Sequence, residues 1–190
     1  MSPARRFLLL FLICTAYSIV RYNLVLDVPW ARFPAWVMNK VFSFVSVGSL
    51  MLAARAFVKL HSNDARFFGR ASFHCALIHS CLSLILISAS NYPDFFGVDG
   101  DQLNLKGQLV ALAGALAIWL YWLLFQTHPK ADQFRALKIG ASVLVALHLL
   151  PMGIPKWGDP SAWSGLLPIS LLSMGFVVGA IAWLVVKRKK

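Results

Sequence analysis

Residues 66–79 read RFFGRASFHCALIH, from Arg66 to His79. Two arginines stand near the start of this stretch, and the uncharged run that follows continues to Pro93. His79 lies nine residues past Arg70, which is roughly 13–14 Å along an α-helix at about 1.5 Å per residue. A titratable side chain at that depth in a lipid-spanning helix is costly and points to a functional site. The stretch therefore predicts a membrane helix with a functional histidine in its interior.

The composition indicates an integral membrane protein. Of the 190 residues 59% are hydrophobic, and the mean hydropathy is +0.70, whereas soluble domains are about 45–50% apolar. The three cysteines lie in apolar runs without a C-x-x-C pair, so we expect no disulfide framework. A single domain over residues 1–190 is the natural expectation.

Six apolar segments have the length that a bilayer requires, about 17–24 residues each. They cover residues 7–26, 35–58, 71–90, 107–127, 136–153 and 165–186. The sequence thus predicts an all-α integral membrane bundle of six transmembrane helices. The intervening stretches, including residues 59–70 and 154–163, are expected to be connections.

The basic residues fall mainly on one side of these predicted spans. The larger group holds 13 of the 18 lysines and arginines: Arg5, Arg6, Arg55, Lys59, Arg66, Arg70, Lys130, Arg135, Lys138 and residues 187–190. Because lysine and arginine mark cytoplasmic loops, we expect both termini in the cytoplasm. The expected location is the bacterial inner membrane, as a multi-pass protein. The net charge of +11 then reflects topology and contact with the lipid bilayer, and no nucleic-acid partner is expected.

A second histidine lies at the same predicted depth as the first. His148 stands ten residues past Lys138 in another uncharged run, and the third and fifth predicted spans run in the same direction. A single membrane histidine usually packs through a hydrogen bond, but two at one depth also fit a shared ligand role, and both interpretations remain open. Ser72, Cys75 and Ser83 share the helical face of His79 and are expected to help orient its ring.

The other histidines have weaker signals. His74 lies five residues before His79, about 140° around the helix, where we expect it to pack, to be accessible to protons or to contact the edge of a cofactor. His61 and His128 fall in predicted connections and are expected to be solvated.

The donor set favours haem iron over other metals. The chain has no clustered Cys/His set for zinc and no intramembrane carboxylate for a di-iron bundle. Two imidazoles without another strong ligand suit one six-coordinate haem b, with His79 and His148 as the metal ligands. Arg21 is the outer-side cation closest to the bilayer; it either binds a haem propionate or extends to the membrane interface.

Two stretches resemble the ferric-reductase-like transmembrane domain, a family that includes the haem-binding membrane subunit of bacterial methionine sulfoxide reductase systems. They are Arg66-x-x-Gly69 followed ten residues later by His79, and Phe134-x-x-Leu137 followed by His148. The resemblance implies a six-span bundle that binds b haems through histidines of the third and fifth spans. Lys138 stands where the family often has a further histidine, so we expect one haem rather than two.

The resemblance also implies a role in moving electrons across the membrane. The chain has no G-x-G-x-x-G motif, so electrons are expected from a separate flavin reductase or from quinol and would pass to an outer-side acceptor. The leading hypothesis is an oxidoreductase-type electron-transfer subunit; a quinone, or a flavin supplied by a partner, is a further expected cofactor. The alternative is a non-catalytic membrane scaffold or assembly subunit with a degenerate haem site.

Overall fold

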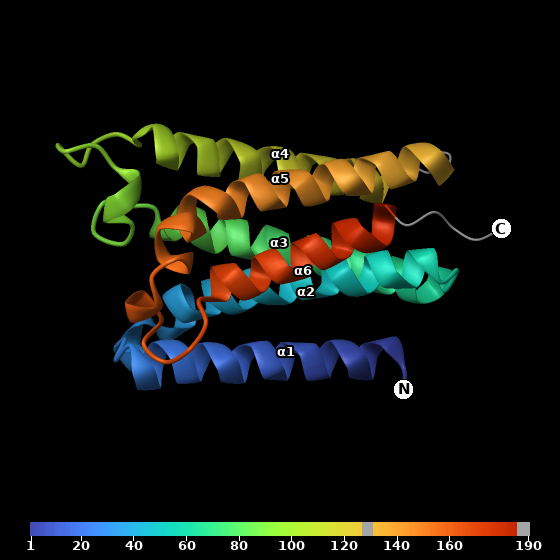
Figure 1. The fold of residues 1–190 in the computed structure, drawn as a ribbon, viewed down its shortest axis with the longest axis horizontal. Helices are drawn as coiled ribbons and strands as arrows, with labels where there is room; N and C mark the ends of the chain where they lie inside the picture. Colours follow the sequence, from blue (N-terminus) through green and yellow to red (C-terminus); the bar gives the residue numbers. More distant parts are fainter. Residues whose placement is uncertain (127–130, 186–190) are drawn as a thin grey trace.

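The computed structural model describes residues 1–126 and 131–185 and is built from helices (Figure 1). The main helices are α1 (Pro3–Ile19), α2 (Met38–Val58), α3 (Ser62–Leu86), α4 (Leu105–Gln126), α5 (Ala131–Trp157) and α6 (Ile169–Val185). Shorter helical segments are η1 (Val20–Val25), η2 (Trp30–Arg32), η3 (Phe33–Val37), η4 (Pro93–Phe95) and η5 (Pro160–Trp163). The predicted all-helical class is confirmed for the described residues.

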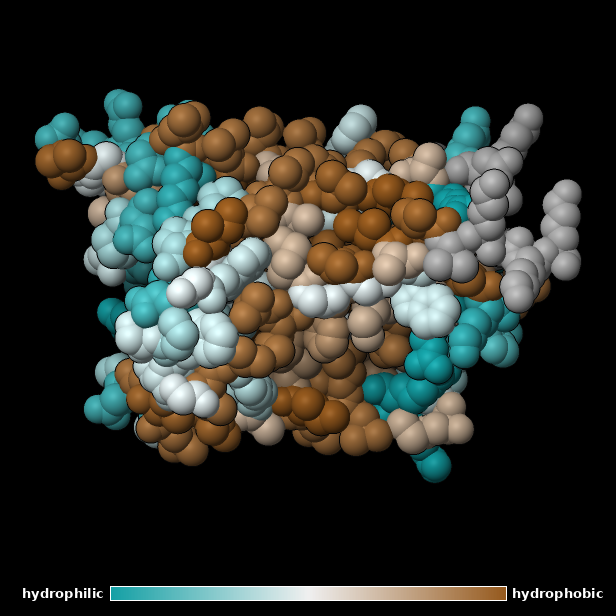
Figure 2. Space-filling model, in the orientation of Figure 1, coloured by the Kyte–Doolittle hydropathy of each residue, from teal (hydrophilic) through white to brown (hydrophobic). Residues whose placement is uncertain are grey.

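Five helical segments are long and apolar enough to cross a membrane. They are Pro3–Val25, Trp30–Val58, Ser62–Leu86, Leu105–Gln126 and Gln133–Trp157. Helix α6 is equally apolar but has 17 described residues. Hydrophobic side chains form a broad belt around the middle of the visible face, and hydrophilic ones gather at its two ends (Figure 2). The chain is therefore a multi-pass helical membrane protein.

The start of α3 differs from the sequence prediction. The helix begins at Ser62, so most of the expected connection over residues 59–70 is helical. Arg6 of α1 donates a hydrogen bond of 2.6 Å to Asp64, and its guanidinium lies 5.2 Å from the ring centre of the fully buried Phe68. These contacts hold the polar first turns of α3 against α1, which the hydropathy of the segment does not indicate.

The end of α5 and the start of α6 also differ from the prediction. Helix α5 passes through Pro151 and Pro155 and ends at Trp157, so the loop expected from residue 154 begins later. Proline is tolerated in membrane helices, and the Trp157 indole donates to Ser170 Oγ of α6 at 3.0 Å, which holds the end of α5 against α6. Helix α6 begins at Ile169, four residues after the predicted start.

Helix α2 is the centre of the bundle and contacts α1, α3 and α6, while α4 packs mainly against α5. Ser46 of α2 and Ser72 of α3 exchange hydrogen bonds: Ser46 Oγ donates to the Ser72 carbonyl at 3.0 Å, and Ser72 Oγ donates to the Ser46 carbonyl at 2.9 Å. Small interfacial side chains of this kind let membrane helices approach closely. They set the register between α2 and α3, on which the site described below depends.

The helices alternate in direction, so α1, α3 and α5 run in parallel (Figure 1). Pro3 and Val185 consequently lie at the same end of the bundle. We call this the basic end, because its described residues include Arg5, Arg6, Arg55, Lys59, Arg66, Arg70, Arg135 and Lys138. The opposite end carries the loop between α3 and α4, with Asp94, Asp99 and Asp101.

Candidate histidine site between helices α3 and α5

The two histidines singled out in the sequence lie next to each other. The ring centroids of His79 on α3 and His148 on α5 are 6.3 Å apart, and the ring planes meet at 83°. Both side chains are half-buried. The counting argument thus correctly predicted that these two imidazoles lie at one level.

The orientation of His79 is set by Asn39, which is fully buried on α2. His79 Nδ1 lies 2.5 Å from Asn39 Oδ1 and 3.1 Å from the Asn39 main-chain oxygen. Ser83 Oγ donates to the same Oδ1 at 3.3 Å, and Asn39 Nδ2 donates to Tyr92 Oη at 3.2 Å. Carbonyl oxygens only accept hydrogen bonds, so Nδ1 of His79 carries the proton and Nε2 keeps a free lone pair.

His148 is held in the same tautomer by α4. Its Nδ1 lies 2.8 Å from the main-chain oxygen of Val110, again a group that only accepts. The ring also packs against Gly114, where an added Cβ would lie 2.9 Å from Nδ1 and 3.2 Å from Cε1. Each imidazole is therefore fixed through Nδ1 and retains Nε2 as the atom able to bind a ligand.

Lys40 is a charged neighbour of the pair that the sequence analysis did not single out. Its Nζ lies 5.2 Å from the ring centre of Trp36 and 5.0 Å from that of Tyr92, the residue to which the Asn39 amide donates. Among the described residues, no carboxylate lies within salt-bridge distance of Lys40. Burial raises the pKa of the Tyr92 phenol, so the phenol beside Lys40 is neutral.

Arg21 lies toward the end of the bundle that is opposite to the basic end, and it is buried, with 5% of its surface exposed. Its Nη1 donates to the main-chain oxygen of Trp163 at 3.0 Å and also to that of Leu166. These bonds join η1 to the segment between α5 and α6. They give Arg21 a structural partner, and its role toward a propionate stays a prediction.

The remaining sequence candidates lie apart from the pair. His74 is exposed, and its ring meets that of Phe125 at 6.0 Å. His61 is exposed just before α3, and His128 lies outside the described residues. Of the three residues expected to orient His79, Cys75 is buried in the core, Ser72 bonds to Ser46, and only Ser83 acts, through Asn39. The expectation that α3 itself supplies the group that orients His79 was wrong, because that group, Asn39, belongs to α2.

The chain matches no protein-family model and no curated protein. Within residues 1–126 and 131–185, no group of three or more His, Cys, Asp or Glu side chains is placed to hold a metal ion. The site therefore offers two neutral imidazoles and a nearby cation. Such a set suits either hydrogen-bonded packing or a metal whose remaining ligands come from a cofactor.

Proposed function

We propose that the chain is a haem b electron-transfer protein that spans the membrane six times with both termini in the cytoplasm. His79 and His148 would be the two axial ligands of a single haem. The observation that carries this proposal is the pair of half-buried imidazoles, each anchored through Nδ1, with centroids 6.3 Å apart. The sequence resemblance to the ferric-reductase-like transmembrane domain supports the same assignment.

The separation of the rings agrees with coordination of one metal from two sides. Imidazole–metal bonds are about 2.0–2.1 Å long, and a ring nitrogen lies roughly 1.1–1.2 Å from its centroid, so two trans imidazoles have centroids about 6.2–6.6 Å apart. The distance of 6.3 Å lies in this range.

The hydrogen bonds of the site suit ligation as well. A metal-binding histidine typically donates its other N–H to a carbonyl or carboxylate, which fixes the ring and raises its basicity. Asn39 and Val110 accept these bonds from His79 and His148. Bound haem b supplies a one-electron couple, and with both axial positions filled by protein, electron transfer is favoured over oxygen chemistry.

Two cations are proposed as partners of the haem propionates. Lys40 is the better placed, since it directly follows Asn39, the partner of His79, on α2 and has no carboxylate partner among the described residues. Arg21 remains the second candidate, although its guanidinium already donates to two main-chain carbonyls. A buried carboxylate without a cationic or hydrogen-bonding partner would be costly.

In this proposal the electrons enter from a separate cytoplasmic flavin reductase or from quinol and leave to an outer-side acceptor. The protein would reside in the bacterial inner membrane. The apolar residues around the two rings would set the potential by limiting access of water.

The experiment compares oxidised and reduced absorption spectra of the purified protein with those of three single variants. His79→Ala and His148→Ala should each lose the spectrum of a six-coordinate low-spin haem. His74→Ala is the matched control, because it removes an exposed imidazole from the same helix, and it should keep that spectrum. A wild-type protein that binds no haem would favour the scaffold function, and retention of the low-spin spectrum in either ligand variant would refute the assignment.

A further inference from the structure

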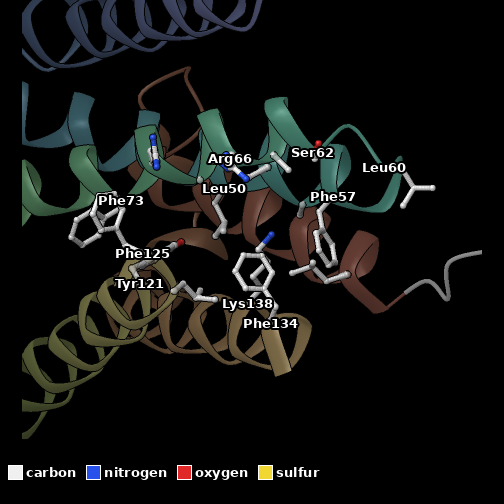
Figure 3. Close-up of a pocket in the computed structure, with 17 residues that line it drawn as sticks. Leu50, Phe57, Leu60, Ser62, Arg66, Phe73, Tyr121, Phe125, Phe134 and Lys138 are labelled. Carbon is white, nitrogen blue, oxygen red and sulfur yellow. The ribbon is translucent and has the colours of Figure 1, made fainter. Parts of the chain in front are cut away.

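A second site lies at the basic end of the bundle. Helices α2 to α6 enclose a cavity of about 750 Å³ there (Figure 3). Neither His79 nor His148 lines it, so the cavity is distinct from the histidine site. Its volume falls within the range of roughly 300–1,000 Å³ that is typical of ligand sites.

Three cations line this cavity: Arg66 and Arg70 of α3 and Lys138 of α5. The nitrogen atoms of Arg66 and Lys138 point toward the interior from opposite walls (Figure 3). Lys138 Nζ lies 4.0 Å from the ring centre of Phe57 and 4.2 Å from that of Phe134. None of the described lining residues is acidic. The charge of the site thus selects an anion.

The rest of the lining selects an apolar body next to that anion. Aliphatic and aromatic side chains make up most of the wall, including Leu50, Phe73, Tyr121, Phe125 and Leu184. A small inorganic anion would leave this apolar surface in contact with water, which is unfavourable. A ligand with a charged head and a long apolar part covers both kinds of surface.

We propose that the cavity binds one anionic phospholipid from the leaflet at the basic end of the bundle. The phosphate lies among Arg66, Arg70 and Lys138, and the start of the acyl chains lies along the aromatic wall. Basic pockets between transmembrane helices bind anionic lipid head groups by this combination of charge and apolar contact. Lipid binding at this site requires no haem, so it can be tested independently of the proposed function.

The test measures lipid retention by native mass spectrometry on delipidated protein to which defined lipids are returned. Wild-type protein should retain one phosphatidylglycerol in preference to phosphatidylcholine. The double variant Arg66→Gln/Arg70→Gln should weaken phosphatidylglycerol binding by roughly tenfold or more. The matched control Arg55→Gln/Lys59→Gln removes two charges from the same end but outside the cavity lining, and it should bind as wild type does.

A second variant fills the cavity without removing charge. Gly69 lines the cavity, and a Cβ added there would have no atom within 4 Å. Gly69→Leu places a good helix former in the middle of α3, so the protein should stay folded while its retention of phosphatidylglycerol falls. Displacement of the lipid by inorganic phosphate alone, equal losses in the control, or unchanged binding in Gly69→Leu would each overturn the proposal.

Discussion

Asn39 links three elements around a single imidazole. Its amide oxygen accepts from His79 and Ser83, and its amide nitrogen donates to Tyr92. Every polar atom of this fully buried side chain is thereby used, which is what burial of an amide in an apolar bundle requires. Asn39 is therefore a positioning residue for His79.

Replacing Asn39 by leucine removes the amide while keeping a similar volume. His79 would keep only the main-chain oxygen at 3.1 Å as its acceptor, so we expect haem affinity to fall by about 10–100-fold. Haem titration of the apo-protein measures this loss. Ser83→Ala, which removes one donor to Asn39 and no contact to the ring, should change the affinity much less. Equal affinities for Asn39→Leu and wild type would contradict the positioning role.

Lys40 and Arg21 can be distinguished by redox titration. If His79 and His148 hold a haem, removing a positive charge next to Asn39 should favour the ferric state, so Lys40→Met should lower the midpoint potential by on the order of tens of millivolts. Arg21→Gln removes bonds to the carbonyls of Trp163 and Leu166 and should mainly lower thermal stability. A larger drop in potential for Arg21→Gln than for Lys40→Met would restore Arg21 as the principal propionate partner.

At the scale of elements, α4 can pack closely against α5 because Gly114 has no side chain where the His148 ring lies. An alanine at position 114 would place its Cβ 2.9 Å from His148 Nδ1 and would displace the ring. Gly114→Ala should therefore lose the low-spin haem spectrum, even though alanine is the better helix former by about 0.5–1 kcal/mol. Gly175→Ala is the matched control, since a Cβ there meets no atom within 4 Å. A Gly114→Ala protein with an unchanged spectrum would contradict the described packing.

The apolar runs and the histidine depths were predictable from the sequence, but the orienting groups were not. Residue counting along two parallel helices placed His79 and His148 at one level because the helical rise is fixed. The rotation of α2 about its axis cannot be predicted in this way, since α2 has buried residues on most of its sides. The sequence signal for Asn39 and Lys40 was an asparagine followed by a lysine within an apolar run.

Helix ends were the least predictable elements. Hydropathy placed the start of the third span at residue 71, but tertiary contacts of Arg6 with Asp64 and Phe68 extend α3 back to Ser62. The prolines of α5 suggested an early end, yet the helix continues to Trp157. In both places, packing against a neighbouring helix overrides the local signal.

At the scale of the whole molecule, the described basic residues gather at one end of the bundle, and this asymmetry predicts its orientation. A reporter fused after Lys190 should be active only on the cytoplasmic side, and one inserted between Asp99 and Gly100 only outside. Activities on the reverse sides would invert the orientation and move the phospholipid cavity to the outer leaflet. If the two reporters lie on opposite sides of the membrane, the chain crosses it an odd number of times between Gly100 and Lys190.

The most direct test of the haem assignment is the low-temperature electron paramagnetic resonance spectrum of the ferric protein loaded with haem b. Two imidazoles at 83° to each other leave the iron orbitals that interact with the rings nearly degenerate, which makes a low-spin signal strongly anisotropic. We predict such a signal, with one haem bound per chain. A predominantly high-spin signal, or failure to retain haem, would contradict ligation by His79 and His148.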